Sequence, residues 1–374
     1  MHTDSTSSQR TILQICHCYY DPFLDCARQY AVLFKDSRFK VVTVFLSGDA
    51  DAEVADKAAS DEVIFLEYQS KQLSGLKLGI IRKIRELNQQ YNFAAVIAHR
   101  AKPTYVALMA TDLPIFSIQH SFGNFDRFSR RLMVNSFKSR LTLLAVSNAV
   151  RDEIRDRLPG WPENKIETLY NRIDVDKVQA ELLDRQQARQ QLGLPETAWI
   201  VGSVGRLHPD KDPQTLVKAF AKALPLLPKG ALLTLLGKGK LENELKQLIQ
   251  QLDVADNVLM LGNIPEARRY FRAFDLFALS SDHEPFGMVL LEAMAAEVPI
   301  VTTDCGGGAE VVAGLGQLFP LGDEAALAQQ FIAAAHTPID PQSDTAQTRL
   351  NQLFSDEAAR QCFWYLPTVQ SMLH

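Results

Sequence analysis

Two glutamates, Glu284 and Glu292, flank a short apolar segment whose residue types could do chemistry on a phosphorylated sugar. They stand eight positions apart, just over two helical turns, so both carboxylates would lie on about one face, one at the turn and the other along the first helix turns. An apolar run at residues 276–279 predicts a buried strand before them, and residues 288–296 predict a helix. A turn at Gly287 between the strand and the helix would leave backbone N–H groups free to bind a diphosphate. The carboxylates could then accept hydrogen bonds from hydroxyl groups on either side of that diphosphate.

A second segment with phosphate-binding character lies upstream, at residues 202–211. It follows a strand-like run at residues 199–201, and its glycines would let a ligand approach the backbone closely. Arg206 offers a planar fork and Lys211 a point charge, and both suit phosphate oxygens. The alternative is two surface cations near a turn. Their place at the carboxyl end of a strand, where open α/β sheets bind ligands, favours a binding role.

A third segment holds three consecutive glycines, residues 306–308, directly after a strand-like run at residues 300–303. Glycines in sequence cost conformational entropy on folding, so we expect a packing or ligand reason for them. Here too a loop comes before the expected start of a helix.

Together these segments resemble the retaining glycosyltransferases of the GT-B fold, family 4 type. The resemblance is strong over residues 195–325. The motifs that carry it occur in the family's order and are Gly205-Arg206-Leu207 with Lys211, Leu236-Gly237-Lys238-Gly239, Leu261-Gly262-Asn263-Ile264, Asp275-Leu276-Phe277, Ser280-Ser281, the Glu284/Glu292 pair, and Val298-Pro299-Ile300-Val301. Residues 145–147 and 170–174 continue it more weakly, with Arg172 where the family usually has Gly.

The resemblance implies an α/β chain with two Rossmann-like domains facing across a cleft. We expect an acceptor-binding domain at residues 1–175 and a nucleotide-sugar-binding domain at residues 176–352. The aromatic segment at residues 353–374 would form a helix that crosses back to the first domain. Strand-like runs alternate with helical stretches throughout, as parallel sheets require. We expect strands at residues 12–16, 41–46, 63–66, 95–98, 115–118, 143–146, 166–170, 200–204, 232–236, 258–261, 276–279 and 300–302. A polar stretch at residues 172–195 is the expected boundary and could hold a short helix.

The resemblance also implies residue roles. Glu284 would hold the sugar hydroxyls, Glu292 the ribose, and residues 262–264 the nucleobase. Arg206, Lys211 and backbone N–H groups near Gly287 and Gly307 would stabilise the negative charge of the departing diphosphate, so that no metal is needed. The implied donor-binding residues are Gly205, Arg206, Lys211, Gly262, Asn263, Ile264, Glu284, Phe286, Gly287, Met288, Val289 and Glu292.

In the first half, His120 ends a predicted strand, and the resemblance implies a hydrogen bond from it to the donor sugar. We therefore count it as catalytic, with Glu284, Arg206 and Lys211. The candidate acceptor-binding residues are Asp21, His99 and Arg127. Retention of configuration is implied by the resemblance, and no residue is an evident covalent nucleophile.

Composition agrees with a globular enzyme. The chain of 374 residues is 47% hydrophobic and 22% charged, which is long for one core and usual for two domains. No apolar run is long enough to span a bilayer, and the polar start lacks a signal core, so we expect a cytoplasmic protein. The five cysteines have no zinc-binding spacing, and reduced thiols fit that compartment.

Charge is uneven along the chain. Residues 1–175 hold 23 Lys/Arg and 20 Asp/Glu, a balance of +3, and the remainder holds 16 and 24, a balance of −8. A basic cluster with neighbouring phenylalanines comprises Arg127, Arg130, Arg131, Lys138 and Arg140. It could bind a glycan or lipid-linked acceptor, such as a lipopolysaccharide core, or contact the anionic inner membrane; the alternative is a solvated helix face. The acidic chain argues against nucleic acid.

Three other functions fit part of the pattern. A metal-dependent transferase would use an Asp-x-Asp triplet, and residues 174–176 and 210–212 both have that form. A sugar-nucleotide epimerase can share the two-domain architecture, and a non-catalytic sugar-nucleotide-binding scaffold could keep the pocket. We expect a UDP-linked hexose donor, from the frequency of such donors in the resembled family.

Overall fold

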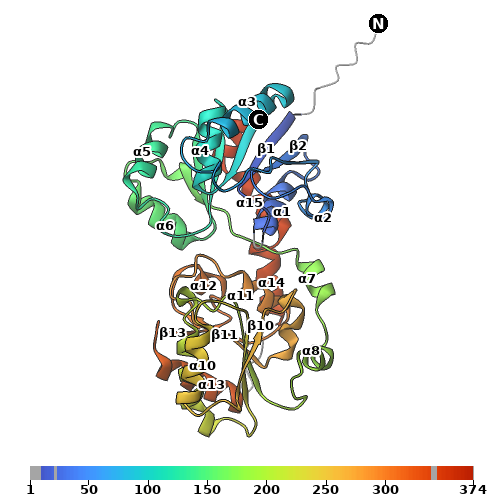
Figure 1. The fold of residues 1–374 in the computed structure, drawn as a ribbon, viewed down its shortest axis with the longest axis vertical. Coiled ribbons are helices and arrows are strands. Elements are labelled where there is room, and N and C mark those ends of the chain that lie inside the picture. The colour runs from blue at the N-terminus through green and yellow to red at the C-terminus, as the bar shows by residue number, and fades with distance from the viewer. Residues whose placement is uncertain (1–9, 21–22, 338–342, 374) are drawn as a thin grey trace. The chain divides into compact units, whose positions relative to one another are not determined.

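The computed structural model describes residues 10–20, 23–337 and 343–373. The chain divides into two compact units, one of Met1–Asn171 with Asp356–His374 and the other of Arg172–Ser355. Each unit has its own parallel sheet flanked by helices (Figure 1). The expected α/β class with two Rossmann-like domains is therefore confirmed.

The sheet of the first unit has seven strands in the order β3-β2-β1-β4-β5-β6-β7. Its strands are β1 Arg10–Cys16, β2 Phe39–Phe45, β3 Glu62–Phe65, β4 Phe93–His99, β5 Ile115–Gln119, β6 Leu141–Ala145 and β7 Ile166–Thr168. Its helices are α1 Phe23–Ala31, α2 Ala52–Lys57, α3 Leu78–Tyr91, α4 Ala101–Ala110, α5 Phe128–Ser136, α6 Asn148–Arg157, α15 Asp356–Tyr365 and α16 Pro367–Leu373, with 3-10 turns η1 Val32–Phe34 and η2 Glu163–Lys165.

The central strands β5 and β6 are buried along their whole length, as expected for a parallel sheet covered on both faces. Parallel pairing aligns their carboxyl ends: Ile15 pairs with Ala98, and Ala98 pairs with Ser117. The loops that follow β1, β4 and β5 therefore meet at one edge of the sheet.

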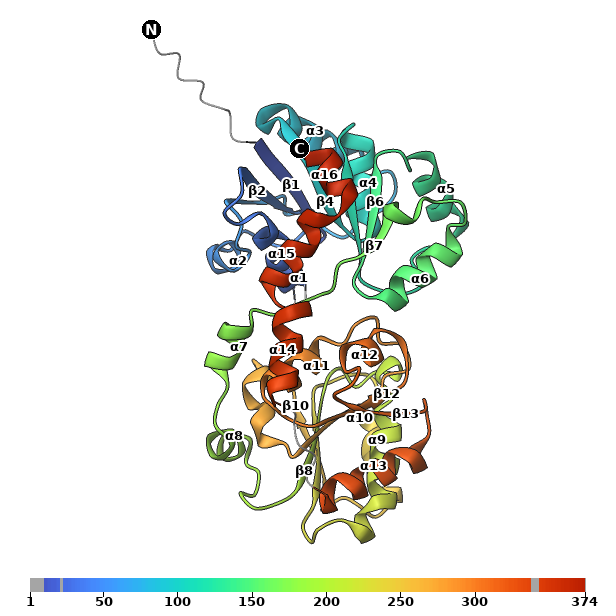
Figure 2. The ribbon, with the colours of Figure 1, turned by 180° about the vertical axis from the view of Figure 1, so that it is seen from behind.

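The C-terminal helices α15 and α16 pack on the first unit, over β1 and β4 (Figure 2). The ring of Phe363 lies 5.5 Å from that of Phe34 and 5.6 Å from that of Phe116. Trp364 donates a hydrogen bond from Nε1 to the carbonyl of Leu33 at 2.9 Å. The aromatic side chains that the sequence marked for burial thus join the last segment to the first half of the chain.

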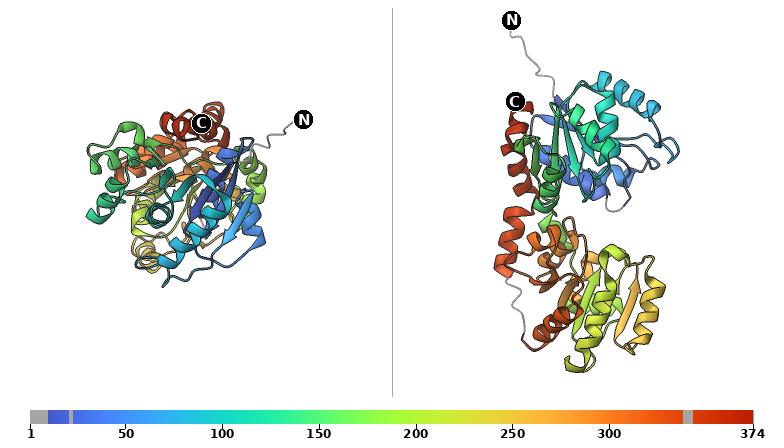
Figure 3. Two further views of the ribbon diagram at one scale, coloured as in Figure 1. Left: turned by 90° about the horizontal axis from the view of Figure 1, so that it is seen from above. Right: turned by 90° about the vertical axis from the view of Figure 1, so that its left-hand side faces the viewer.

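The sheet of the second unit has six strands in the order β10-β9-β8-β11-β12-β13. Its strands are β8 Ile200–Val204, β9 Leu232–Leu236, β10 Val258–Gly262, β11 Leu276–Leu279, β12 Ile300–Thr303 and β13 Gln317–Phe319. Its helices are α7 Val175–Glu181, α8 Arg185–Leu192, α9 Pro213–Ala223, α10 Glu242–Gln251, α11 Met288–Ala295, α12 Gly306–Val311, α13 Glu324–His336 and α14 Ser343–Leu353, with 3-10 turns η3 Pro209–Lys211, η4 Leu224–Leu226 and η5 Ala267–Ala273. Helices α9, α10 and α13 close one apolar core against this sheet, and Figure 3 shows the ribbon from two further sides.

The polar stretch that the sequence assigned to the boundary folds into two short helices, α7 and α8. Asp184 caps α8 by accepting a hydrogen bond from the Gln187 amide at 2.8 Å, and Gly193 ends it with φ +68°. The short helix expected there is confirmed. No helix within the described residues has both the length and the apolar character needed to cross a membrane.

Candidate active site

Three loops meet at the carboxyl edge of the second sheet, after β8, β9 and β10. Backbone hydrogen bonds join them: the Gly205 amide donates to Leu236 O at 2.9 Å, and the Gly237 amide donates to Gly262 O at 2.7 Å. The Leu207 amide donates to Lys238 O at 3.1 Å. Motifs that are far apart in the sequence therefore form one continuous surface at this edge of the sheet.

Two glycines allow the first two of these loops to touch. A Cβ on Gly237 would lie 1.9 Å from Gly205 O, and one on Gly239 would lie 2.2 Å from Leu207 O. Gly237 also has φ +143°, a backbone conformation that L side chains rarely adopt. These positions need glycine for backbone-to-backbone contact.

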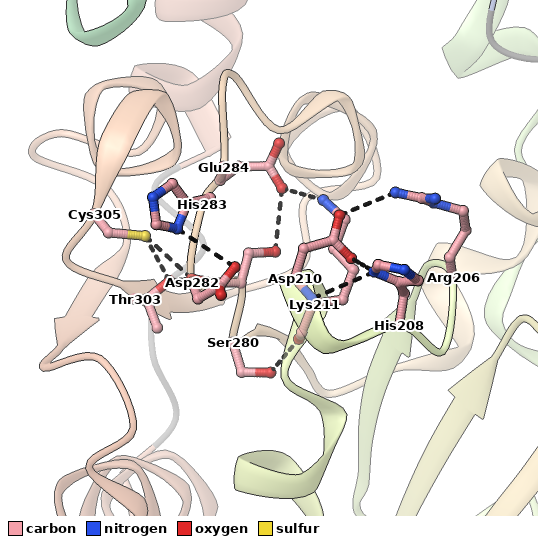
Figure 4. A network of polar contacts seen from close by, with 11 residues as sticks. Arg206, His208, Asp210, Lys211, Ser280, Asp282, His283, Glu284, Thr303 and Cys305 are labelled. Atoms are coloured by element: carbon pink, nitrogen blue, oxygen red, sulfur yellow. Dashed lines mark hydrogen bonds and ion pairs between the residues drawn. The ribbon is translucent and has the colours of Figure 1, made fainter. Parts of the chain in front are cut away.

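Lys211 and Glu284 form the central ion pair of the site (Figure 4). Nζ of Lys211 lies 2.6 Å from Oε2 of Glu284, and only 8% of the glutamate side chain is exposed. Ser281 donates to the same carboxylate oxygen at 3.2 Å. Ser280 fixes the lysine loop by donating to Lys211 O at 2.9 Å and to Asp212 O at 2.8 Å. The carboxylate and the ammonium group are thus held in place before any ligand arrives.

Arg206 is the exposed cation of the same edge, with 68% of its side chain accessible. Its Nη2 lies 3.0 Å from Oδ2 of Asp210, and the other oxygen of Asp210 contacts Nδ1 of His208. An ion pair this exposed is weak, so the guanidinium group can exchange the carboxylate for a phosphate.

The loop before α11 carries Glu284, so the carboxylate lies in the turn and not on the helix. Gly287 ends this turn at φ +93°. The Gly307 amide donates to Glu284 O at 2.8 Å, and a Cβ on Gly307 would lie 2.2 Å from Pro285 O. The glycine run therefore has a packing reason. Because the Gly307 amide already has an acceptor, our expectation that it stabilises a diphosphate needs correction, and the amides of Met288 and Val289 in the first turn of α11 remain candidates.

A pocket of about 270 Å³ lies along these loops. It brings together four of the predicted donor-binding residues, Gly205, Arg206, Asn263 and Ile264. Its volume is near the lower end of the range of small-molecule sites. Lys238 also lines it, a residue to which the sequence analysis gave no role.

The other predicted donor residues lie on or before α11. Glu292 is half-buried within the helix, eight residues after Glu284, so only this one of the two glutamates is helical. The ring of Phe286 is 2% exposed and lies 5.7 Å from that of Phe354, so its side chain packs in the interior of the unit.

Both Asp-x-Asp triplets provide helix caps. Asp174 accepts from the Lys177 amide at the start of α7, and Asp212 accepts from Oγ1 of Thr215 at 2.6 Å at the start of α9. Asp210 contacts Arg206 and His208. These contacts explain Asp174, Asp210 and Asp212 in structural terms.

In the first unit, His99 and His120 form a stacked pair at the edge where β4 and β5 end. Nδ1 of His99 lies 3.1 Å from Nε2 of His120, and the rings are 5.4 Å apart. Burial, and next the charge of Arg100, lower the pKa of His120 to about 3. Burial, then His120 and Arg100, hold the pKa of His99 well below its usual value. Both imidazoles are therefore neutral at pH 7, and one donates to the other.

The basic cluster of the first unit is partly structural. Arg130 donates to Asn124 O at 3.0 Å, and Arg131 donates to Phe125 O at 3.1 Å. Arg140 donates to Leu108 O at 2.6 Å. Arg127 is exposed just before α5. Asp21, the other predicted acceptor residue, lies outside the described residues.

The chain is similar in sequence to known protein families and to individual proteins. Residues 184–349 match the family described as "Glycosyl transferases group 1", and residues 35–177 match "Glycosyltransferase Family 4". The N-acetyl-alpha-D-glucosaminyl L-malate synthase of Bacillus anthracis is 30% identical over 290 residues, covering 72% of this chain and 73% of the relative. The lipopolysaccharide core biosynthesis mannosyltransferase LpsB of Rhizobium meliloti is 36% identical over 149 residues, covering 38% of this chain and 41% of the relative.

Among solved structures, Anabaena Alr3699/HepE in complex with UDP and glucose is similar, with a TM-score of 0.77. The alignment covers 97% of this chain and 98% of that one at 21% identity, so this likeness speaks for the fold.

Proposed function

The chain belongs to the group 1 glycosyltransferases, with a family 4 N-terminal domain, and from that premise we propose that it moves a hexose from UDP to a glycan. The enzyme is thus a glycosyltransferase, and the proposal concerns its donor, its acceptor and its stereochemistry. We propose retention of the anomeric configuration and a reaction that needs no metal ion.

The observation that carries this proposal is the Lys211–Glu284 ion pair beside Arg206 at the edge of a pocket. Breaking a sugar–phosphate bond develops negative charge on the leaving diphosphate. Arg206 and Lys211 supply positive charge to that diphosphate, and the first amides of α11 add N–H donors. In other transferases a divalent cation stabilises this negative charge. We propose that in this chain the protein's own groups stabilise it.

We assign roles to the other candidate residues as follows from their place at the pocket and along the chain. Asn263 and Ile264 lie with Arg206 on its wall and would hold the uracil. Glu292 would accept from the ribose hydroxyls and Glu284 from the hexose hydroxyls. His120, neutral at pH 7, would donate or accept one hydrogen bond at the sugar. We assign no covalent nucleophile, so the acceptor would attack from the face that the diphosphate leaves.

For the acceptor we propose a lipid-linked glycan or a lipopolysaccharide-core sugar, reached from the cytoplasmic face of the inner membrane. Support comes from α5, where Phe128 is 69% and Leu132 57% exposed, four positions apart and close to the exposed Arg127. An apolar pair beside a cation suits the surface of an anionic bilayer. The relative LpsB is itself named for lipopolysaccharide core biosynthesis.

The epimerase and scaffold alternatives are not favoured, because both family matches describe transferases. An epimerase would convert the nucleotide sugar without an acceptor. Product analysis of the donor alone therefore separates the two enzymes.

A thermal-shift panel of UDP, GDP, ADP and their sugar conjugates tests the proposal. A ligand that binds the folded chain raises the melting temperature by mass action, about 2.7 kcal/mol of stabilisation at a hundredfold excess over Kd. We expect UDP and a UDP-hexose to give the largest shifts. Equal or absent shifts for every nucleotide would contradict the proposed donor, and loss of activity with chelator would contradict metal independence.

A further inference from the structure

Besides the His99–His120 pair, four further cationic or hydrogen-bonding side chains gather at the carboxyl edge of the first sheet. His17 follows β1, and Arg100 follows β4. Because Ile15 pairs with Ala98 on these neighbouring parallel strands, the segments that carry His17 and Arg100 leave the sheet at the same edge. Lys102 lies in the first turn of α4, and Lys77 directly precedes α3.

The charges of Arg100 and Lys102 act on the pKa values of the neighbouring His17 and Lys77. Burial, and then the positive charges of Lys102 and Arg100, lower the pKa of His17. Burial and the charge of Lys102 also lower the pKa of Lys77. Lys102 therefore acts on both His17 and Lys77, and Arg100 acts on His17. The group, here termed the Arg100 cluster, comprises His17, Lys77, Arg100 and Lys102.

None of the three cations of the cluster forms an ion pair within residues 10–20, 23–337 and 343–373. The guanidinium group of Arg100 lies 4.3 Å from the centroid of the Phe23 ring. Nζ of Lys77 donates to Gly75 O at 2.7 Å and lies over the Tyr105 ring at 5.1 Å. Arg28, in the same unit, instead lies 2.7 Å from the Asp356 carboxylate. Three like charges that pair with no carboxylate of the described residues raise the free energy of the unit, and an anion would lower it.

Two further features point to a ligand. Nδ1 of His17 is buried and has no hydrogen-bond partner in the described part of the chain. Arg100 has φ +71°, a strained conformation for a residue with a side chain. Its amide donates to Ile118 O at 3.0 Å, and its carbonyl accepts from Oγ1 of Thr104 at 2.8 Å, so the strained backbone is held on both sides.

We propose that the Arg100 cluster is a subsite for an anionic group of the acceptor, a phosphate or a carboxylate. The guanidinium fork of Arg100 suits two oxygens of such a group, and Lys102 and Lys77 supply point charges. His17 donates one hydrogen bond from Nδ1, and the amides that open α4 add to the positive field. This inference rests on the proposed function, and it narrows the acceptor to an acidic one.

Histidine NMR on the full chain tests the subsite, because the chain has only eight histidines. His17 reports the Arg100 cluster, while His208 reports the donor pocket beside Arg206. With histidine labelled and each signal assigned by a His→Gln replacement, the probes are inorganic phosphate, glucose 6-phosphate, glucuronate and neutral glucose at pH 7.5. We expect saturable shifts of the His17 signal with the anions and none with glucose. Tighter binding of glucose 6-phosphate would identify the anionic group as a phosphate, and tighter binding of glucuronate would identify it as a carboxylate.

Charge-removing variants make the test specific. Arg100→Gln and Lys102→Gln should each raise the Kd that His17 reports at least fivefold, and together at least tenfold. Both side chains are exposed, so these variants should fold. The control is Lys40→Gln, an exposed cation near the opposite, amino-terminal edge of the same sheet, which should leave the Kd unchanged.

Two results would overturn the inference: a His17 signal that no anion moves, or equal affinity in Arg100→Gln, Lys102→Gln and the wild type. The proposed donor is read separately, through the His208 signal on addition of UDP. A response of His208 to UDP without a response of His17 to anions would remove the acidic acceptor and leave the donor assignment standing. The reverse pattern would keep the subsite and remove the proposed donor.

Discussion

Lys211 and Glu284 lie 73 residues apart in the chain and meet with Nζ 2.6 Å from Oε2, at the edge where β8 and β11 end. Because the two strands are neighbours in the sheet, their loops must converge, and the pair joins the two segments that carry most of the expected donor site. The ammonium group of Lys211 is thus held at this edge, where it can donate charged hydrogen bonds to a diphosphate.

Replacing Glu284 by Gln should reduce transfer at least about a hundredfold, the usual effect of losing one preorganised polar contact with the transition state. Lys211 then loses its ion-pair partner, so the free energy of unfolding should also fall, by about 1 to 3 kcal/mol. UDP release from the UDP-hexose and urea denaturation measure the two effects. Glu324→Gln, which breaks exposed ion pairs with Lys218 and Lys222, is the matched control and should transfer normally. Near-normal turnover in Glu284→Gln would contradict its proposed role.

Replacing Asp210 by Asn should tighten UDP binding. In the ligand-free chain, Asp210 holds Arg206 at 3.0 Å and competes with a phosphate for the same guanidinium group. An exposed ion pair is worth about 0.2 to 1 kcal/mol, so its loss should lower the Kd by a factor of about 1.4 to 5. Isothermal titration calorimetry measures this change. Weaker UDP binding would instead mean that Asp210 supports the bound state.

Replacing Gly237 by Ala should destabilise the second unit and weaken nucleotide binding. The new Cβ would lie 1.9 Å from Gly205 O, and the backbone has φ +143°. We expect a loss of about 2 kcal/mol or more in the free energy of unfolding, because both backbone strain and a steric clash oppose the change. Gly79→Ala is the control, since Gly79 lies in α3 and its new Cβ would meet only the hydroxyl of Tyr68, at 3.8 Å, so the change should be neutral or slightly stabilising. Equal melting temperatures for the two variants would argue against the close packing of the loops.

Acid should destabilise the first unit through its buried histidines. The pKa of His120 is about 3 in the folded chain against 6.5 when unperturbed. Below pH 6.5 the unfolded chain binds a proton that the folded chain does not, so stability falls as pH falls through this window. At about 1.4 kcal/mol per pH unit, His120 alone would cost about 2 kcal/mol by pH 5. Melting curves from pH 7.5 to 5 should show this loss in the wild type and less of it in His120→Asn. The same slope in both proteins would contradict the assignment.

The sequence predicted most of the sheet strands because parallel strands buried on both faces are continuous apolar runs, as in residues 232–236 and 276–279. It missed β13, whose three residues Gln317–Phe319 include only one buried side chain. β13 lies at the edge of the sheet and is defined by its hydrogen bonds to β12, which leave little trace in the composition of the sequence.

The sequence marked Arg206, Lys211 and Glu284 because one residue type suits one chemistry, and the structure brings them to one edge of the sheet. Other parts depend on contacts between distant segments. The need for Gly237 arises from Gly205, and the His99–His120 contact requires β4 and β5 to be neighbours. The sequence placed one glutamate at the turn and the other along the first helix turns, and this is what the structure has, since α11 begins at Met288 with Glu284 before it and Glu292 within it.

The central claim is that Arg206 and Lys211 bind the diphosphate of the donor. Calorimetric titration of UDP and of uridine into the wild type, Arg206→Gln and Lys211→Gln tests it most directly. The account predicts that each variant loses about tenfold or more in affinity for UDP, as expected for a charged hydrogen bond, and keeps its affinity for uridine. Unchanged UDP affinity in both variants would contradict it.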